Sequence, residues 1–509
     1  MDVTADFIPP AIDWYALSPY IVLLAGSLVL LLVGALTPRW RKGWYAVLTA
    51  STAGAAGVVA AVQFAELGEE EPRSIINGVL SHDRFGLLAV VALSVAVVIS
   101  SMMASDNAVS DRDRAETDSL EPYALLLTAA LGAAVMVTAN DLVVLFLGIE
   151  ILSISMYVLA ASDRRRASSH EAGLKYFVLG GFSSAFLLYG IALVYGTTGQ
   201  TNLGNIAVVL ADEITVPRND AMLLAGVALL LVGLSFKVSL VPFHSWTPDV
   251  YHGSPTYVTG FMASLGKIAA VVALVRVFVI AFPGRADDWR PVVFLLASLT
   301  LVVGSVLAIV QTDVKRMLAY SSVSHAGFML VGLEAAGRLD SSAASEGISS
   351  TLIYVVLYSV LALGSFAAVS TISSRNNSAS TSIDSFRGIA KTNPVFALGF
   401  TVLLLAQAGV PLTSGFVAKF GVVRAAVSTE SYILAILAMV SAVIAAYLYL
   451  RIMVSMWLTE TSAPEVAQPV RISAAGRISL GITVATTLIL GVFPSILLDL
   501  EGLATRLAR

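Results

Sequence analysis

The sequence predicts an all-α polytopic membrane protein that crosses the bilayer about fourteen times. Of the 509 residues, 57% are hydrophobic and only 13% are charged, and the mean hydropathy is +0.85. These values exclude an ordinary soluble protein and a disordered chain. The apolar runs are continuous rather than alternating, which excludes a membrane β-barrel, so only helices can satisfy the backbone groups in lipid.

The individual spans follow from runs of about 20 mainly apolar residues, the length needed to cross the hydrocarbon layer. The connecting loops are too short to hold a soluble domain, so we expect any chemistry to take place in the membrane. In chain order the runs lie near residues 17–37, 44–64, 85–104, 122–139, 141–161, 171–196, 221–241, 255–282, 291–310, 316–334, 349–373, 394–424, 430–457 and 477–499.

Basic residues gather in alternate loops, which predicts that those loops face the cytoplasm. Such clusters include residues 164–166, the pair Lys315 and Arg316, and the pair Arg471 and Arg477. With an even number of spans, both termini are then expected outside. The first 20 residues contain no Lys or Arg. They lack the positive segment of a cleaved signal peptide, so we expect the first span to be retained.

Composition also limits the chemistry of the chain. The absence of cysteine excludes disulfides, thiolate-bound zinc and ordinary iron–sulfur clusters. The net charge of −4 is small and spread over the loops, which indicates no nucleic-acid partner. The sequence has no nucleotide-binding loop, no His-rich metal spacing and no nucleophile motif, so we predict no cofactor or metal in this chain and no bond-breaking chemistry.

Two of the predicted spans contain a helix break. The seventh reaches Lys237 and is followed by Pro242, and the long twelfth contains Pro411 and Gly415 before Lys419. Proline removes a helical hydrogen bond and clashes with the preceding turn. Because the broken spans are five apart, they cross in opposite directions, as in inverted-repeat transporters, and spans 4 to 8 and 9 to 13 are candidate repeats. The order of lysine and proline differs between the two breaks, so this pattern alone does not establish an internal duplication of the chain.

Ionisable residues inside spans give the strongest indication of function. An ionised side chain near the bilayer centre costs about 2.5 to 3.5 kcal/mol on the insertion scale. A desolvated lysine can lose its proton, whereas arginine remains charged. We predict a proton relay in which a Glu–Lys pair forms and breaks. The alternatives are structural: an ion pair, a lysine bonded to helix carbonyls, or an anchoring side chain. The relay candidates are Glu150, Lys237, Lys267 and Lys419.

Five other residues are weaker candidates. Glu171 and Lys175 are spaced i, i+4 near a cytoplasmic loop, so a helix-surface ion pair is a serious alternative. His325 could relay protons, as could His244 and His252 near the seventh break. A lone histidine is, however, more often simply hydrogen-bonded.

Three stretches resemble a known family. Residues 236–270 read FKVSLVPFHSWTPDVYHGSPTYVTGFMASLGKIAA and residues 311–332 read QTDVKRMLAYSSVSHAGFMLVG. Both resemble hallmark segments of the antiporter-like subunits of respiratory complex I. The wording PDVYHGSPTYVTGF, the lysine at 267 and the stretch NDLVVLFLGIEILSISMYVL over residues 140–159 are similar to the N-type members of bacterial NADH:quinone oxidoreductase. The resemblance covers essentially all fourteen spans.

The resemblance implies a proton-pumping module with an internal repeat. Its parts would be N-terminal helices over 1–121, a first repeat over 122–282, a second repeat over 291–457 and a C-terminal helix over 458–509. The family's relay positions match Glu150 in span 5, Lys237 in span 7, Lys267 in span 8 and Lys419 in span 12. The M-type relative carries glutamate at the last position. Lysine there, and no long lateral helix after Arg509, fit the N type.

The same resemblance implies a translocase subunit without redox chemistry of its own. Quinone reduction in neighbouring subunits would drive protons from the cytoplasm to the outside of a bacterial plasma membrane. NADH, FMN, iron–sulfur clusters and quinone are expected in partner subunits, and the M-type and K-type subunits and lipids as neighbours. Two alternatives are a subunit of an Mrp-type sodium/proton antiporter complex and a purely structural membrane-arm subunit whose charges fix helix packing.

Overall fold

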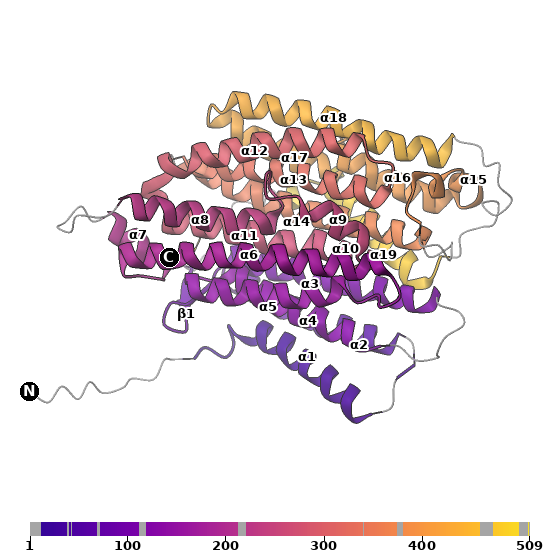
Figure 1. Cartoon of the computed structure of the whole chain (residues 1–509), viewed down its shortest axis with the longest axis horizontal. Coiled ribbons are helices and arrows are strands. Elements are labelled where there is room, and N and C mark those ends of the chain that lie inside the picture. Colours follow the sequence, from indigo (N-terminus) through magenta and orange to yellow (C-terminus); the bar gives the residue numbers. More distant parts are fainter. Residues whose placement is uncertain are drawn as a thin grey trace, which may run out of the picture.

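The computed structural model is a bundle of long helices that run roughly side by side (Figure 1). It describes residues 12–37, 40–41, 43–68, 72–110, 119–211, 220–338, 341–373, 380–458, 472–497 and 507. Helices α1 and α2 lie along one side of the bundle, and α12 and α18 lie along the opposite side (Figure 1). Helices α14 and α19 of the second half pack against α3 of the first half, so the two halves of the chain share an interface inside the bundle.

All fourteen predicted spans are helical, which confirms the fold class. Twelve helical stretches of the described chain are each long and apolar enough to cross a membrane, whereas α13 is more polar and α16 and α17 are shorter. The helices of the first half are α1 Ser18–Leu36, α2 Trp44–Glu66, α3 Arg84–Ser110, α4 Glu121–Thr138, α5 Leu142–Ala160, α6 Ala167–Thr198, α8 Asp220–Val238, α10 Thr256–Phe261 and α11 Lys267–Arg276. Those of the second half are α12 Ala286–Ile309, α13 Val314–Ala336, α14 Ser341–Ser373, α16 Pro394–Ala408, α17 Ser414–Ser428, α18 Tyr432–Trp457 and α19 Ala474–Val492.

Both predicted helix breaks are present. Helix α8 ends at Val238, and the chain resumes helical structure only in α9 Trp246–Gly253. Helix α16 ends at Ala408, and α17 begins at Ser414. At the second break a Cβ atom on Gly415 would lie 1.8 Å from the Ala406 carbonyl oxygen, so only glycine allows this close approach. Each break leaves helix-terminal carbonyls that need a partner other than the helix itself.

Several short elements were not predicted from the sequence. The loop between the second and third spans folds into a hairpin of β1 Arg73–Ile75 and β2 Leu80–His82, so the all-α prediction missed a small sheet. The remaining short elements are α7 Leu203–Ala211, η3 Pro283–Arg285, η4 Ile383–Phe386 and α15 Ile389–Thr392. These segments are too short to give a clear hydrophobic period, which is why the pattern of apolar residues did not reveal them.

The eighth span is not a uniform α-helix. Two π-helical turns, η1 Met262–Gly266 and η2 Val277–Ala281, flank α11, and Lys267 follows η1 directly. Such turns are rare and often occur at functional sites. This span and that of Ala344–Ser373 are the most buried of the twelve apolar spans, because 89% of each apolar window is buried, compared with 28% for α1, and α13 is buried along almost its whole length. The fold thus places Lys267 at the centre of the bundle.

The predictions about the two ends of the chain lie partly outside the described residues. The location of the N-terminus depends on residues 1–11, and part of the predicted C-terminal region, residues 459–471 and 498–506, is likewise not described. Within the described part, the last span is α19, which ends at Val492. The expected outward position of both termini therefore stays a prediction.

Candidate functional site

Lys267 binds the end of the first broken helix. Its side chain is 1% exposed, and its Nζ donates a hydrogen bond of 2.7 Å to the carbonyl oxygen of Val238, the last residue of α8. This carbonyl has no helical partner because the helix stops there. A lysine from the deeply buried eighth span therefore closes the break in its neighbour.

Lys419 does the same at the second break, from within its own span. It is 8% exposed, and its Nζ donates to the carbonyl oxygens of Gln407 at 2.8 Å and Ala408 at 3.0 Å, at the end of α16. The ammonium also lies 5.1 Å from the ring centre of Phe328 on α13. Its partners are thus two carbonyls and an aromatic face, all uncharged.

Lys237 has a different partner. It is 7% exposed, and its Nζ donates to the Ser153 hydroxyl at 2.5 Å. The ammonium also lies 5.5 Å from the ring centre of Tyr157 and 5.4 Å from that of Tyr176. Helix α5 provides Ser153 and Tyr157, and α6 provides Tyr176, so Lys237 is held where α5, α6 and α8 meet.

Glu150 lies on α5 one turn before Ser153 and is half-buried. Its Oε1 accepts a hydrogen bond of 2.5 Å from the Ser184 hydroxyl on α6. Within the part of the chain that the structure describes, no ion pair joins Glu150 to Lys237 directly, but the carboxylate lies within electrostatic range of the ammonium. The predicted Glu–Lys pair is therefore open in this arrangement, with Ser153 as the bonded partner of the lysine.

His325 is buried and belongs to a hydrogen-bond network that reaches the second break. Its ring nitrogens lie 2.8 Å from the Tyr354 hydroxyl and 3.2 Å from the Tyr449 hydroxyl. Tyr449 is bonded to Ser321 at 2.5 Å, and Ser321 donates at 3.5 Å to the side chain of Gln407, whose backbone carbonyl holds Lys419. Sequence reasoning missed Gln407, although a lone amide in the apolar run LLLAQAGVP was a visible signal.

Lys315 is a further buried lysine that sequence reasoning assigned to a cytoplasmic loop. It lies instead in the first turn of α13 and is 2% exposed. Its Nζ donates to the carbonyl oxygens of His252 at 3.1 Å and Ser254 at 2.6 Å, at the end of α9. Three lysines thus close the ends of three short or broken helices.

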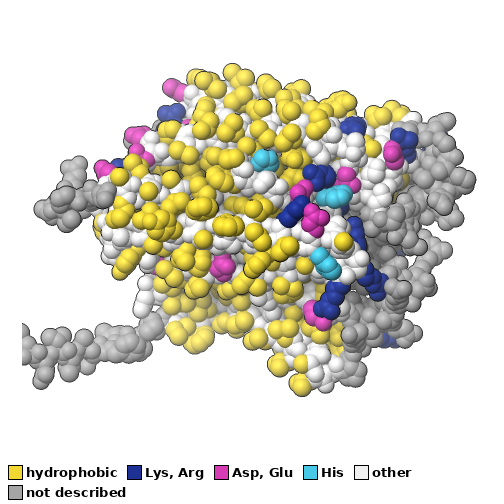
Figure 2. Space-filling view, in the orientation of Figure 1, with side chains coloured by type: hydrophobic (Ala, Val, Ile, Leu, Met, Phe, Trp, Pro, Cys, Tyr) yellow, Lys and Arg dark blue, Asp and Glu magenta, His cyan; other side chains and the backbone are white. Residues whose placement is uncertain are grey.

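Glu171 and Lys175 belong to a separate group of charges, which we call the end cluster: Glu171, Lys175, Asp249, His252, Asp313 and Arg316. Lys175 pairs with Glu171 at 2.6 Å and with Asp249 at 2.9 Å, and Arg316 pairs with Asp249 at 2.7 Å. His252 pairs with Asp313 at 3.1 Å. Figure 2 shows acidic, basic and histidine side chains side by side toward one end of a largely hydrophobic face.

Asp313 is the most buried carboxylate of the end cluster. Its side chain also accepts a hydrogen bond of 2.6 Å from Thr381 and one of 3.1 Å from the backbone N–H of Arg316, as the N-cap of α13. Burial alone raises the pKa of Asp313, but the hydrogen bonds from His252 and Thr381 outweigh burial, and the pKa lies below its ordinary value. The other predicted histidine, His244, lies in the first break with its ring near Tyr320.

One fully buried ion pair lies away from the lysines. Arg276 of α11 donates to Asp83 at 2.8 and 2.6 Å and to the Val137 carbonyl at 2.6 Å. The guanidinium of Arg276 donates from both of its terminal nitrogens to Asp83 and remains charged. This ion pair therefore ties the eighth span to α3 and α4 and does not carry protons.

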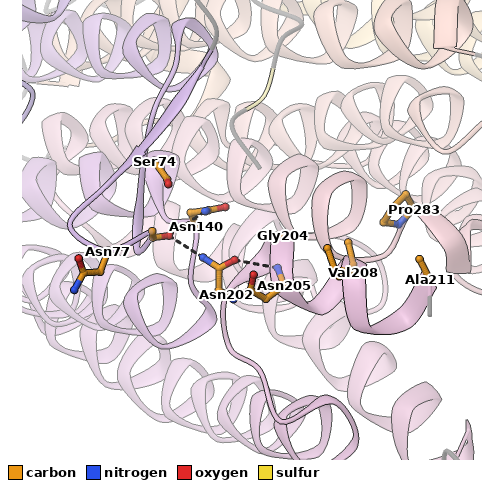
Figure 3. A pocket seen from close by; sticks show the side chains of 11 residues that line it. Ser74, Asn77, Asn140, Asn202, Gly204, Asn205, Val208, Ala211 and Pro283 are labelled. Atoms are coloured by element: carbon orange, nitrogen blue, oxygen red, sulfur yellow. Dashed lines mark hydrogen bonds between the residues drawn. The ribbon is translucent and has the colours of Figure 1, made fainter. Parts of the chain in front are cut away.

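An open pocket of about 730 Å³ lies near the hairpin and α7 (Figure 3). Asparagine side chains line it, and Asn140 and Asn202 both donate to the Gly78 carbonyl, at 3.0 and 2.8 Å. None of the predicted relay residues lines this pocket. Among the described residues there is also no group of three or more His, Asp or Glu side chains placed to hold a metal ion.

Comparison with known proteins agrees with this geometry. Residues 139–445 match the family model described as NADH:quinone oxidoreductase/Mrp antiporter, TM. The subunit N of NADH-quinone oxidoreductase from Mycobacterium tuberculosis is 38% identical, over 98% of this chain and 99% of the relative. That from Parafrankia is 40% identical, over 97% of this chain and 95% of the relative.

Solved structures give the same result. A chain of respiratory complex I from Thermus thermophilus matches with a TM-score of 0.76 and 29% identity, over 94% of this chain and 98% of that chain. A chain of the Mrp complex from Dietzia matches with a TM-score of 0.84, over 97% of both chains, but at 21% identity this likeness shows the fold alone. The chain therefore belongs to the N-subunit family of NADH-quinone oxidoreductase, the antiporter-like membrane subunits of respiratory complex I.

Proposed function

We propose that this chain translocates protons as the N subunit of a bacterial NADH:quinone oxidoreductase. Glu150, Lys237, Lys267 and Lys419 form the relay, and His325 links its second half. NADH oxidation and quinone reduction take place in other subunits, which also hold the redox cofactors, and this chain contributes no redox step. Its neighbours are the M-type and K-type subunits in the plasma membrane.

The observation that carries this proposal is the kind of partner that the buried lysines have. Among the described residues, Lys237, Lys267 and Lys419 bond only to hydroxyl or carbonyl oxygens. A buried ammonium that binds a carboxylate leaves an uncompensated negative charge when it loses its proton. An ammonium bound to neutral oxygens leaves only neutral groups, so each of these lysines can release a proton and take one up again.

The order of the relay follows from the positions of these groups. A proton from the cytoplasm reaches Lys237 when the nearby Glu150 carboxylate draws it in, and it then passes to Lys267 at the centre. His325 lies within electrostatic range of both Lys267 and Lys419, and its hydrogen bonds lead to the second break. Each charge moved outward works against about 2.3 kcal/mol per 100 mV, so the redox subunits must supply the energy.

The test is NADH-driven, quinone-linked proton pumping in vesicles that hold the assembled complex with Lys237→Ala. We expect the complex to assemble while pumping and coupled NADH oxidation collapse. Lys391→Ala is the matched control, because Lys391 is an exposed lysine outside the membrane spans, and we expect it to pump as the wild type does. Pumping at the wild-type level with Lys237→Ala would mean that the buried charges are structural.

The Mrp-type alternative differs in its coupling ion. A sodium/proton antiporter requires sodium on one side, whereas a complex I subunit does not. We expect NADH-driven acidification in these vesicles to persist when sodium is removed. Acidification that depends on sodium would favour the antiporter alternative.

A further inference from the structure

Gln407 is a buried amide in the last turn of α16, directly before the second helix break. Its side chain is 2% exposed, although the surrounding run LLLAQAGVP is otherwise apolar. The relay described above does not use this side chain. A polar group that is buried without hydrogen bonds costs free energy, so the partners of Gln407 indicate what it does.

The side chain of Gln407 ties the end of α16 to α14. Its Nε2 donates a hydrogen bond of 2.5 Å to the Ser365 hydroxyl and lies 3.5 Å from the Leu361 carbonyl oxygen. Ser365 is fully buried, and α14 is one of the two most buried apolar spans. A helix that is closely packed on all sides does not shift easily. The bond to Ser365 therefore anchors the last turn of α16 to a fixed neighbour.

The backbone of the same residue holds Lys419. The ammonium binds the carbonyl oxygens of Gln407 at 2.8 Å and Ala408 at 3.0 Å. The lysine side chain also lies against Gly409, because a Cβ atom there would be 2.9 Å from the Lys419 Cδ atom. A rotation of this last turn would move both carbonyls together. The anchor on the Gln407 side chain thus decides where the ammonium lies.

Gln407 also faces the hydrogen-bond network of His325. Its Oε1 lies 3.5 Å from the Ser321 hydroxyl, and Ser321 is bonded to Tyr449, which lies 3.2 Å from the His325 ring. One residue therefore contacts Lys419 through its backbone and the His325 network through its side chain. The amide is a neutral donor and acceptor, so it fixes these groups without carrying a proton itself.

The first helix break is held in a different way. Val238, whose carbonyl binds Lys267, has an apolar side chain, but Lys267 comes from a different span and so connects the break to a neighbouring helix. Lys419 belongs to the same broken span as the carbonyls that it binds. Its bonds do not connect the second break to another helix, so that connection must come from elsewhere. The Gln407 side chain provides it.

We propose that Gln407 is the positioning residue of the second break. It anchors the end of α16 to α14 and thereby holds Lys419 at a fixed distance from the His325 network, without placing a charge beside the lysine. Reaction rates fall steeply when the reacting groups are misplaced, so loss of the anchor slows proton exchange between His325 and Lys419. The inference rests on the proposed function and adds the residue that positions the last lysine of the same relay.

The experiment removes the anchor from either end in the assembled complex. Gln407→Met keeps the length of the side chain but cannot donate a hydrogen bond, and Ser365→Ala removes the other partner. We expect both complexes to assemble and NADH-driven pumping per complex to fall roughly twofold to tenfold, the scale of one lost hydrogen bond. Full pumping with either variant overturns the proposal.

Two matched controls are available in the same chain. Gln63 is a buried glutamine of α2, 1% exposed, whose amide donates to the Tyr15 carbonyl. Ser359 is a buried serine of α14 that is bonded to a carbonyl of its own helix. We expect Gln63→Met and Ser359→Ala to pump as the wild type does. A loss as large as that of Gln407→Met would mean that any buried polar group has this effect, which contradicts a positioning role.

A double variant tests whether Gln407 acts through Lys419. The rate of coupled NADH oxidation that remains in a Lys419→Ala complex should not fall further when Gln407→Met is added. A further fall by the same factor as in the wild type would show an effect independent of Lys419, and the proposal would be wrong. Lys419→Ala alone separates the two proposals. Normal pumping by Lys419→Ala contradicts the relay, whereas its collapse together with full pumping by Gln407→Met contradicts only the role of Gln407.

Discussion

The buried lysines and the end cluster use charge in opposite ways. In the end cluster, Lys175, Arg316 and His252 each pair with a carboxylate. In the interior, Lys237, Lys267 and Lys419 bond to neutral oxygens, and no ion pair to these three occurs in the described part of the chain. The difference teaches that a charge fixed by an opposite charge serves structure, whereas a charge held by carbonyls and hydroxyls remains free to titrate.

Lys315 makes the comparison sharper, because it shares features with both groups. It is buried and bonds to two helix-terminal carbonyls, as Lys419 does, but it lies beside the end cluster, two residues from Asp313. If neutral partners alone defined a relay lysine, Lys315 would be one. We expect position along the membrane to matter as well, and Lys315 to act as a helix cap.

The largest expected effect comes from Lys267→Arg. The guanidinium keeps the charge and can donate to the Val238 carbonyl, but it does not release its proton under working conditions. We therefore expect normal assembly and loss of most proton pumping, measured as dye-reported acidification per NADH oxidised. Lys315→Arg is the matched control, since it makes the same change at a buried carbonyl-binding lysine.

The two outcomes separate relay from structure. If Lys267→Arg pumps normally, the central charge only closes the helix break, and the purely structural alternative holds for this residue. If Lys315→Arg loses pumping as completely as Lys267→Arg does, the end of the bundle belongs to the relay too, and the contrast between the two regions is wrong.

A smaller effect is expected from Asp313→Asn in the end cluster. The folded pKa of Asp313 lies below its ordinary value of 3.8. Its charge therefore contributes stability above about pH 3.8, and this contribution is lost as the pH falls through the folded pKa. Asparagine keeps the N-cap but not the charge. We expect a loss of about 1 to 2 kcal/mol at neutral pH and a weaker dependence on acid.

The measurement is the thermal midpoint of the solubilised complex from neutral pH down into this acid range, for the wild type and Asp313→Asn. The two curves should converge as the pH falls. A constant difference at all pH values would show that the carboxylate charge contributes nothing, and that the hydrogen bonds to Thr381 and His252 act only as neutral contacts.

Apolar run lengths were enough to predict the helices of this fold. Pro242 and Pro411 predicted the two helix breaks, because the proline ring removes a helical hydrogen bond and clashes with the preceding turn. The π-helical turns beside Lys267 and the hairpin at residues 73–82 were not predicted. Packing decides the π-helical turns, and the strands of the hairpin are too short to show a hydrophobic period.

The site was predictable only as a list of residues. The sequence indicated Glu150 and Lys237 as partners, but it could not show that Ser184 and Ser153 occupy their bonding positions, because side chains from three helices decide this. Glu334 lies in the apolar run FMLVGLEAAG and was a visible anomaly. The sequence placed it at the end of the tenth predicted span, and it could not show the ion pair with Arg290 at 2.7 Å, because the packing of α12 against α13 decides this contact.

The smallest expected effect is that of Glu171→Gln, which tests the most exposed ion pair of the end cluster. Glu171 and Lys175 are 63% and 42% exposed, and Lys175 keeps Asp249 at 2.9 Å when Glu171 is neutralised. Exposed i, i+4 pairs contribute about 0.3 to 0.5 kcal/mol, so we expect a small change in thermal midpoint and unchanged pumping. Asp249→Asn, which removes the carboxylate shared by Lys175 and Arg316, should destabilise more. A pumping defect with Glu171→Gln would place the pair in the proton path, because so weak a structural contact cannot otherwise reach the interior lysines.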